Sequence, residues 1–508
     1  MSIVQSLVAE HALRVDFPPE ALAEAAAHVA QPGIDDPALE DLGHLPFVTI
    51  DEVHSRDLDQ ALCVERDDAS GAFVAWYAIA DAAHYVPVGS ALFTEALRRG
   101  ATYYFPGANV PMLPRNLSEG VVSLNPNEAR RALVWRLVVQ PDGSCTKTTL
   151  HPARIRSRAK LDYDGVQAWF DNGGAVEGGP DVEASLRALA RLGRARLASA
   201  PSRGVVRIHR KDIAITDGGE SFVARADERN DVERFNEQLS LLCNIEGARW
   251  LEAASERAPG SIQPIFRVHR PPRRELLDRL EDQLRQLCAH HGLDPERWVW
   301  DPDRIGLAEF FDQLPTGPIA QVVHRQAIMM NRAATFETEP GPHHGVGAER
   351  YGRFSAPMRE VVGVFLHQEL AEARSGLRSA LPPSFDSAEA LQQAVITAAT
   401  ESRALQRTVD RQLNRAVLDH LFDQATAPLP ATVMGVSRGR VHVQLADPPI
   451  DVKVYFRHLD EPLHADDLGM AATKADGTAF VVAGDAVEVV VGGRDADADR
   501  WALGLRRR

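Results

Sequence analysis

Three aspartates stand close together after an apolar stretch near the start of the chain. In 46-PFVTIDEVHSRDLDQAL-62, Asp51, Asp57 and Asp59 follow residues 47–50, which read as a buried strand. Clustered carboxylates repel one another, and their oxygens are the ligands that Mg²⁺ prefers. The pattern therefore predicts a Mg²⁺ site, although a solvated acidic turn fits the same spacing. The calcium loop of an EF-hand does not fit, because its required glycine is missing.

The bulk composition is that of ordinary globular domains. The chain has 508 residues, with 44% hydrophobic and 25% charged, which predicts roughly two to four domains. No apolar run reaches the length of a membrane span, and the first residues lack a secretion signal. The four cysteines are scattered without zinc-site spacing. We expect a monomeric cytoplasmic protein with no membrane partner.

The charge balance limits how the chain could bind nucleic acid. A formal net charge of -15 argues against a protein that coats nucleic acid by bulk charge. A basic channel inside an acidic shell remains open.

Periodicity along the chain predicts an α+β protein with a separate C-terminal β domain. Mixed short strands and turns are expected over 46–155, and alternating strands over 203–225. From Ala431 the sequence alternates with period two between Gly and Asp turns, which predicts an OB-type barrel of about five strands. Helices are expected within 1–45 and over 160–200, 231–255, 272–290 and 385–424.

Three blocks of sequence together resemble one enzyme family. The segment FVTIDEVHSRDLDQAL is similar to the D-x5-D-x-D-D signature of the ribonuclease II/ribonuclease R family, which has an RNB catalytic domain. The segments 102-TYYFPGANVPMLPRNLSEGVVSLNPNEAR-130 and 338-TEPGPHHGVGAERYGRFSAPMRE-360 resemble two further blocks, and the C-terminal strands resemble an S1 domain. The resemblance covers about residues 8 to 508 and implies three parts. They are an N-terminal helical extension (1–45), an RNB catalytic domain with mixed sheets and surrounding long helices (46–427) and an S1-like OB-fold RNA-binding domain (428–508).

The resemblance implies a metal-dependent 3′→5′ exoribonuclease that acts on the 3′ end of single-stranded RNA and releases nucleoside 5′-monophosphates. Asp51 and Asp57 would hold Mg²⁺ or, in its place, Mn²⁺, and Gln60 falls on a fourth metal-binding position. Asp59 would be the carboxylate essential to the chemical step, with Asp57 also placed at the catalytic centre. Arg359 would contact the scissile phosphate.

The same resemblance implies residues that hold the RNA. Tyr104 matches an aromatic that stacks on a base near the 3′ end. Tyr163 and Glu237 fall where family members contact the ribose 2′-OH, and Asp410 falls where the family has a Glu near the active site. Taken alone, Tyr104 reads as a core residue, and Glu237 and Asp410 read as solvated charges.

Several positions depart from the family pattern. Gln60 replaces an Asp and leaves a neutral ligand, so metal affinity should be lower. Glu360 replaces a basic residue beside Arg359 and would put a negative charge near the phosphate path. Ile208 stands where an aromatic would complete the base clamp with Tyr104. Members of the family usually begin with cold-shock domains, and only a short stretch precedes Phe47 here, so we expect that RNA-gripping element to be missing.

Two other functions remain open from the sequence. One is a catalytically weak or silent RNB protein that binds RNA 3′ ends as a regulator, which Gln60 favours. The other is a phosphodiesterase on short oligoribonucleotides, which the short N-terminal segment favours.

Overall fold

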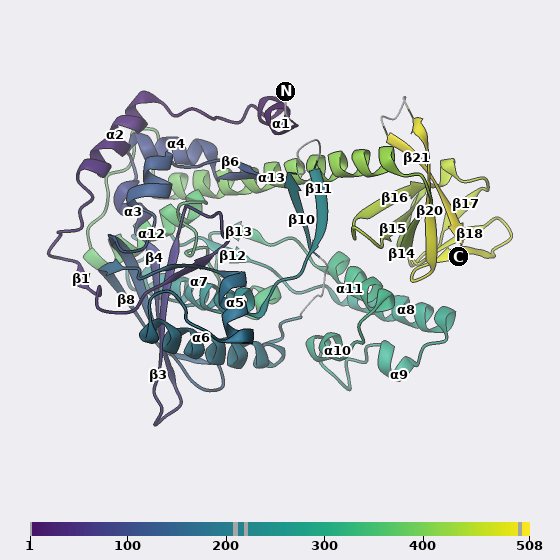
Figure 1. Cartoon of the computed structure of the whole chain (residues 1–508), viewed down its shortest axis with the longest axis horizontal. Helices are drawn as coiled ribbons and strands as arrows, with labels where there is room; N and C mark the ends of the chain where they lie inside the picture. The colour runs from purple at the N-terminus through teal and green to yellow at the C-terminus, as the bar shows by residue number, and fades with distance from the viewer. Residues whose placement is uncertain (1–2, 207–211, 218–221, 496–499, 508) are drawn as a thin grey trace. The chain divides into compact units, whose positions relative to one another are not determined.

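The computed structural model describes residues 3–206, 212–217, 222–495 and 500–507 (Figure 1). The chain divides into two compact units, each built from separate segments. Unit 1 comprises Met1–Arg203, Arg229–Arg270 and Ala334–Arg407, and unit 2 comprises Gly204–Glu228, Pro271–Ala333 and Thr408–Arg508. The boundaries expected at 45/46 and 427/428 stay predictions. Residues 271–333, however, group with the C-terminal strands and not with the preceding part of the expected catalytic domain.

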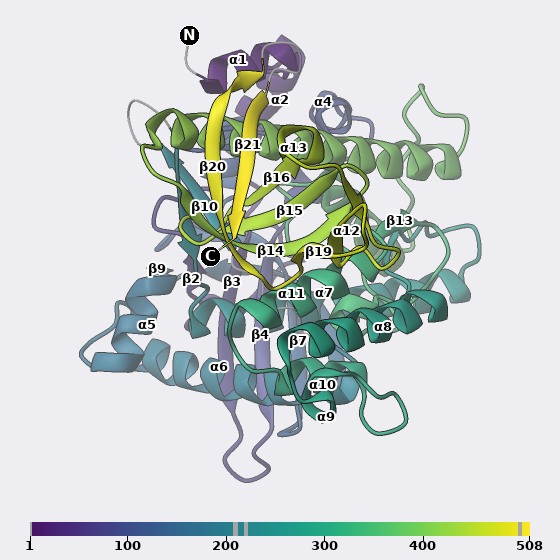
Figure 2. The same cartoon turned by 90° about the vertical axis from the view of Figure 1, so that its right-hand side faces the viewer.

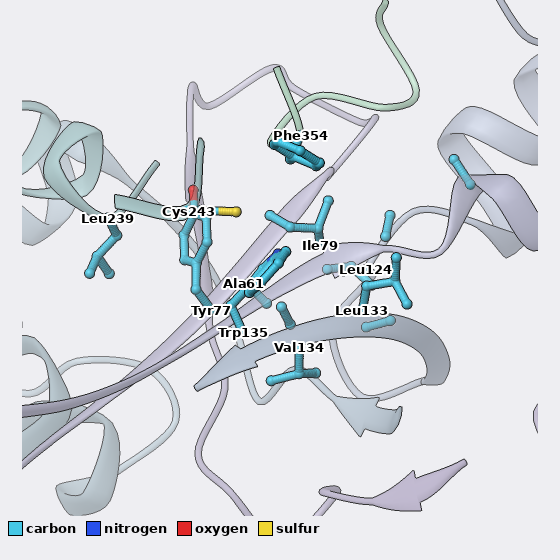
Figure 3. Packing of buried hydrophobic residues seen from close by; sticks show 14 of the residues in the cluster. Ala61, Tyr77, Ile79, Leu124, Leu133, Val134, Trp135, Leu239, Cys243 and Phe354 are labelled. Atoms are coloured by element: carbon cyan, nitrogen blue, oxygen red, sulfur yellow. The ribbon is translucent and has the colours of Figure 1, made fainter. Parts of the chain in front are cut away.

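The main sheet of unit 1 has five strands in the order β1-β8-β7-β4-β3. Strands β8, β7, β4 and β3 are antiparallel neighbours, and β1 joins β8 in parallel. Tyr77 and Ile79 of β4 and Trp135 of β7 are fully buried (Figure 3). The strands are β1 (Glu40–Asp41), β3 (Gln60–Arg66), β4 (Phe73–Ala80), β7 (Ala129–Val139) and β8 (Cys145–Arg156).

Unit 1 also contains pairs of short strands outside its main sheet. The strand expected at 47–50 forms β2 (Thr49–Asp51), pairs in parallel with β9 (Lys160–Asp162), and is buried as predicted. Two antiparallel pairs complete the set. They are β5 (Tyr103–Phe105) with β6 (Ala108–Val110), and β12 (Phe266–Val268) with β13 (Thr335–Glu337).

Helix α7 (Asp231–Arg257) is the central helix of unit 1 and confirms the helix expected at 231–255. Its first turn is closed by a capping box, in which Asn230 and Glu233 each bond the other's backbone N–H. The helix packs against α5, α6, α12 and β4. The other helices of unit 1 are α1 (Ile3–Glu10), α2 (Pro19–Ala30), α3 (Ala82–Tyr85), α4 (Ala91–Arg99), α5 (Tyr163–Asn172), α6 (Pro180–Ala198), α12 (Val361–Ser375) and the first part of α13 (Ala388–Gln424).

Among its described residues, unit 2 contains four complete α-helices, the last part of α13, and three sheets. A five-stranded antiparallel sheet has the order β16-β15-β14-β20-β21, and its two edge strands, β16 and β21, contact each other. Figure 2 shows β20 and β21 side by side in this sheet. The five strands agree with the predicted count, but three further strands form a second sheet, β17-β18-β19.

The elements of unit 2 have the following bounds. The helices are α8 (Arg274–His291), α9 (Pro295–Trp298), α10 (Leu307–Gln313) and α11 (Pro318–Met330). The strands are the hairpin β10 (Asp212–Asp217) and β11 (Phe222–Asp227), then β14 (Leu429–Ser437), β15 (Arg440–Leu445), β16 (Asp451–Tyr455), β17 (Leu463–Ala465), β18 (Ala471–Lys474), β19 (Ala479–Val482), β20 (Ala486–Asp495) and β21 (Arg500–Arg507).

The fold as a whole is a mixed α/β structure with several separate sheets, as the periodicity predicted. In the described ranges, no helix combines the length and the apolar character that crossing a membrane requires.

A buried carboxyl group in α12 makes folding stability depend on pH. Glu369 is 5% exposed and accepts a hydrogen bond from the Gln263 backbone N–H at 2.6 Å. Burial raises its pKa from 4.5 to about 7, so the folded chain holds this proton more tightly than the unfolded chain. The stabilisation from Glu369 is therefore complete below pH 4.5 and is lost as the pH rises through about 7.

We predict that Glu369→Gln removes this pH-dependent part of the free energy of unfolding. Urea unfolding from pH 5 to pH 8 should show the variant gaining stability relative to the parent chain as pH rises. The exposed Glu256→Gln is the matched control and should leave the pH profile of the parent unchanged. Parallel profiles for Glu369→Gln and the parent would contradict the prediction.

Candidate active site

The aspartate cluster lies where one strand ends and the next begins. β2 ends at Asp51 and β3 begins at Gln60, so Asp57 and Asp59 occupy the connecting loop. Asp51 Oδ1 accepts hydrogen bonds from the Glu52 backbone N–H at 2.8 Å and from Ser55 Oγ at 3.0 Å. These bonds hold the first residues of the loop against the end of β2.

Asp59 is the most buried member of the cluster, at 1% exposure. Its Oδ1 accepts from the Met358 backbone N–H at 2.9 Å, and its Oδ2 accepts from Arg359 Nε at 2.7 Å. Burial raises the pKa of Asp59 to about 7, the Arg359 guanidinium opposes that rise, and Asp57 adds to it. One guanidinium therefore does not fully compensate this carboxylate, and a further positive charge would favour its ionised form.

The segment that carries Arg359 is held by one buried amide. Asn244 of α7 accepts hydrogen bonds from the backbone N–H groups of Phe354 at 2.7 Å and Ser355 at 3.2 Å. Its amide nitrogen donates to Ser355 Oγ at 3.0 Å and to Tyr351 Oη at 3.1 Å. All of these groups are buried, so the bonds form in a low-dielectric setting where leaving any of them unpaired is costly.

Both the oxygen and the nitrogen of the Gln60 side-chain amide form hydrogen bonds. The hydroxyl of Tyr77 donates to Gln60 Oε1, and Gln60 Nε2 donates to the Ser355 carbonyl oxygen at 2.5 Å. Tyr77 is fully buried in β4. Gln60 thereby joins the sheet to the same segment that Asn244 holds. Its expected role as a metal ligand stays a prediction, and this geometry supports a positioning role.

Six of the predicted site residues line one cavity of about 220 Å³ in unit 1. Its wall is formed by carboxylates, arginine side chains and a tyrosine, together with neutral residues. The lining residues are Ile50, Asp51, Asp59, Gln60, Tyr163, Arg229, Glu233, Asn236, Glu237, Ser240 and Arg359. Asp51, Asp59, Gln60, Tyr163, Glu237 and Arg359 were therefore brought together as expected.

A second cavity of about 390 Å³ shares Gln60, Ser240 and Arg359 with the first. Tyr104 lies on its wall and is 42% exposed. Tyr104 is therefore not a core residue, and its ring is accessible to a flat ligand. Gln406 holds its backbone through two hydrogen bonds, at 3.0 and 3.1 Å.

Asp57 and Tyr104 connect the aspartate loop to the second cavity. Tyr104 Oη lies 3.5 Å from Asp57 Oδ2, at the limit of a hydrogen bond. Burial, opposed by Arg359, raises the pKa of Asp57. Burial also raises the pKa of Tyr104, so its hydroxyl keeps its proton at neutral pH.

Helix α7 contributes four cavity residues, of which sequence reasoning found only Glu237. Glu233, Asn236 and Ser240 are the others, and all four recur at helical spacing on a helix that is otherwise largely buried. Asn236 Nδ2 donates to Tyr163 Oη at 3.1 Å, and burial raises the pKa of Tyr163 to about 12. A polar stripe of this kind is a sequence signal that could have identified these residues.

Glu360 corrects one expectation. Glu360 follows Arg359 in the sequence, but its carboxylate is paired with two other arginines. Arg353 forms one ion pair with it. Arg403 Nη2 lies 2.9 Å from Oε1 and 2.8 Å from Oε2 of Glu360. Burial by itself would raise its pKa, but the two guanidinium groups outweigh burial and lower the pKa to about 2. The group is thus a neutralised charge within a cluster that is net positive, because two cations surround one anion.

Two further residues singled out in the sequence are Asp410 and Ile208. Asp410 lies on the part of α13 that belongs to unit 2, whereas the other predicted site residues belong to unit 1. Ile208 lies outside the described residues.

The donor set fits a hard cation such as Mg²⁺. Asp51, Asp57 and Asp59 offer only oxygen ligands, and burial leaves Asp57 and Asp59 short of compensating charge. Their oxygens do not all lie within 4.8 Å of one another. One ion would therefore be held by one or two of these carboxylates, which is the usual number for Mg²⁺ completed by water and substrate phosphate.

Comparison with known sequences identifies relatives of this chain. Residues 39–375 match the family model of the RNB domain. Exoribonuclease 2 of Erwinia tasmaniensis is 33% identical over 424 residues, which cover 80% of this chain and 61% of that protein. Exoribonuclease 2 of Proteus mirabilis is 28% identical over 431 residues, covering 81% and 62%. The chain thus spans about three-fifths of the length of these relatives.

Solved structures share the fold at lower sequence identity. Mycoplasma genitalium RNase R, solved with ribose-methylated single-stranded RNA, has a TM-score of 0.87 at 21% identity and covers 99% of this chain and 77% of its own. Yeast Ssd1, described as a pseudonuclease, has a TM-score of 0.62 at 13% identity and covers 87% and 53%. Since the family model spans residues 39–375, which include every predicted site residue except Asp410, the chain belongs to the RNB domain family.

Proposed function

We propose that this chain is a metal-dependent 3′→5′ exoribonuclease that hydrolyses single-stranded RNA to nucleoside 5′-monophosphates. The observation that carries the proposal is the ion pair between the buried Asp59 and the partly exposed Arg359, on the wall of a cavity that Asp51 also lines. Carboxylates for a cation and a guanidinium for a phosphate stand side by side there. The names of the matched relatives, Exoribonuclease 2, support the same reaction.

Mg²⁺, or Mn²⁺ in its place, would be held by Asp51 and by Asp57, the latter directly or through water, and Asp59 would orient the ion or the attacking water. A bound ion would supply Lewis-acid chemistry, activating a water molecule and neutralising charge on the leaving oxygen. Asp59 keeps Arg359 in position through its 2.7 Å contact, and Arg359 binds the scissile phosphate and stabilises the charge that develops on it.

The RNA would be gripped by residues around the two cavities. The exposed ring of Tyr104 provides a stacking surface for a base near the 3′ end. Tyr163 can donate a hydrogen bond from its protonated hydroxyl, and the Glu237 carboxylate can accept one, so both suit a ribose 2′-OH. Residues 428–508 would act as an S1-like RNA-binding domain, and Asp410 stays a predicted RNA contact. A cytoplasmic location and a monomeric state also stay predictions.

A catalytically weak or silent protein that binds RNA 3′ ends is the second candidate. The neutral amide of Gln60, already bonded to Tyr77 and Ser355, favours it. The fold by itself does not decide, since RNase R and a pseudonuclease both share it.

The first test is digestion of a 5′-labelled single-stranded RNA with Mg²⁺ or Mn²⁺. We expect a ladder that shortens from the 3′ end and releases nucleoside 5′-monophosphates, and no cleavage when EDTA is present. The same RNA with a blocked 3′ phosphate and a DNA of the same sequence are controls. If clean protein binds the RNA but yields no product with either metal, the silent protein is the correct reading.

The second test is Asp59→Asn, which should lower the turnover number by about 100-fold or more, because the metal step loses its carboxylate. RNA affinity should change little, because binding is spread over many contacts. Breaking a buried ion pair can also destabilise the chain, so thermal unfolding is measured alongside. Asp51→Asn, at a more exposed position, repeats the test if Asp59→Asn fails to fold. Parallel loss of binding and turnover in Asp51→Asn would refute the metal role.

The third test separates positioning by Gln60 from metal binding. A carboxylate cannot donate to the Ser355 carbonyl, so Gln60→Asp and Gln60→Glu should lower the maximal rate without lowering the Mg²⁺ concentration for half-maximal rate. Tyr77→Phe should act in the same direction, because it removes the hydroxyl bonded to Gln60. Tyr85→Phe, which removes another buried tyrosine hydroxyl that bonds Pro32, is the control and should leave both quantities unchanged. A lower Mg²⁺ requirement in Gln60→Asp would instead identify position 60 as a metal ligand.

A further inference from the structure

Two adjacent histidines end helix α8 and face a turn of the C-terminal strands, all within unit 2. His290 Nε2 lies 2.8 Å from Asp485 Oδ1, and His291 Nε2 lies 2.8 Å from the Ala483 carbonyl oxygen. The two imidazole rings are nearly perpendicular, at 86°, with centroids 4.6 Å apart. Two nitrogen donors and one carboxylate oxygen therefore converge from different directions.

The ligand atoms of the three side chains lie close enough together to bind one ion. One ligand atom from each of His290, His291 and Asp485 lies within 4.8 Å of the other two. Across the ranges that the structure describes, no other group of three histidines, cysteines, aspartates or glutamates does so. The Ala483 carbonyl oxygen stands beside them as a possible fourth ligand.

The turn opposite the helix has its own hydrogen bonds, which do not depend on an ion. Asp485 Oδ2 accepts from the Val482 backbone N–H at 2.9 Å, which leaves Oδ1 turned toward His290. Gly484 has a φ of +94°, and a Cβ there would lie 2.5 Å from His291 Nε2. Only glycine fits this backbone conformation and this close approach, so the turn is shaped to let the imidazole reach it.

The helix is fixed to the same region by independent contacts. Gln286 Nε2 donates to Asp466 Oδ2 at 2.7 Å, and Gln283 Nε2 donates to the Leu468 carbonyl at 2.8 Å. These bonds hold the end of α8 near the turn whether or not an ion is bound. The ligands would therefore be arranged before binding, which lowers the entropic cost of binding.

We propose that His290, His291 and Asp485 form a binding site for a divalent transition-metal ion such as Zn²⁺. Two imidazoles and one carboxylate match the ligand preference of Zn²⁺ and its neighbours, and not that of Mg²⁺, which prefers oxygens. A carbonyl or a water completes four-coordinate geometry. The ion would join the end of α8 to the turn between β19 and β20 and so stabilise unit 2.

The competing explanation is that the cluster is held by hydrogen bonds alone. A histidine near the C-terminal end of a helix is favoured by the helix dipole, and Asp485 has a second, weaker cationic neighbour in Arg507 at 4.0 Å. The Nε2 atoms that now bond Asp485 and Ala483 would have to present a free lone pair to the metal, so these two hydrogen bonds would be replaced by coordination. The two explanations therefore differ in one measurable property, the binding of a transition metal.

The experiment uses the full chain without a polyhistidine tag, stripped with EDTA and returned to excess Mg²⁺, which occupies the oxygen-rich site. Zn²⁺ is titrated by calorimetry, and Co²⁺ serves as a spectroscopic probe, since tetrahedral Co²⁺ absorbs strongly in the visible. The variants are His290→Ala with His291→Ala, and Asp485→Asn, whose amide oxygen can still accept from Val482. The matched control replaces two exposed histidines of the same unit, His420→Ala with His464→Ala.

We expect the parent chain and the control to bind one more Zn²⁺ than the double histidine variant, and to show the visible Co²⁺ bands. Their Tm should rise with Zn²⁺, and that of the double variant should not. Asp485→Asn should bind Zn²⁺ at least tenfold more weakly, as even loss of a supporting partner costs roughly 10–100-fold in metal affinity. Equal Zn²⁺ stoichiometry and affinity in all chains would overturn the proposal, and this outcome is independent of ribonuclease activity.

Discussion

The ion pair between the buried Asp59 and the partly exposed Arg359 is the interaction on which the site depends. A carboxylate at 1% exposure is tolerated only with a paired charge and good hydrogen bonds. Both come from a segment about 300 residues further along the chain, through Arg359 Nε and the Met358 backbone N–H. The sheet, α7 and α12 must therefore bring that distant segment against the start of β3, and much of unit 1 serves this requirement.

Helix α7 meets the requirement through one close approach and one amide. Gly247 has no side chain where a Cβ would lie 2.8 Å from the Phe354 ring, and Asn244 one turn earlier bonds the backbone on both sides of that residue. Phe354 also packs edge-to-face on Trp135 of the central sheet (Figure 3). The segment is thus fixed from the helix and from the sheet, which gives Arg359 a defined position.

The two units offer different ligand chemistry to metal ions. Unit 1 presents the carboxylate oxygens of Asp51 and Asp59 in a cavity, and burial raises the pKa of Asp59. This arrangement suits a hard ion that also binds phosphate. Unit 2 presents two imidazole nitrogens at the end of α8 and one carboxylate on the facing turn, which suits a borderline-soft ion held for structure. Charge and ligand type separate the two roles, so one ion need not displace the other.

Features that depend on local pattern could be predicted from the amino-acid sequence. Asp51, Asp57 and Asp59 were recognisable as a cluster after a buried strand, and the period of apolar residues predicted α7, because alternation and helical spacing report which face is buried. The pairing of charged and polar groups that compensate one another could be seen only in the folded chain. Glu360 is neutralised by Arg403, 43 residues away, Gln60 bonds Ser355, 295 residues away, and His290 meets Asp485, 195 residues away. Such pairings follow from how helices and sheets pack, and local sequence carries no record of a partner so far along the chain.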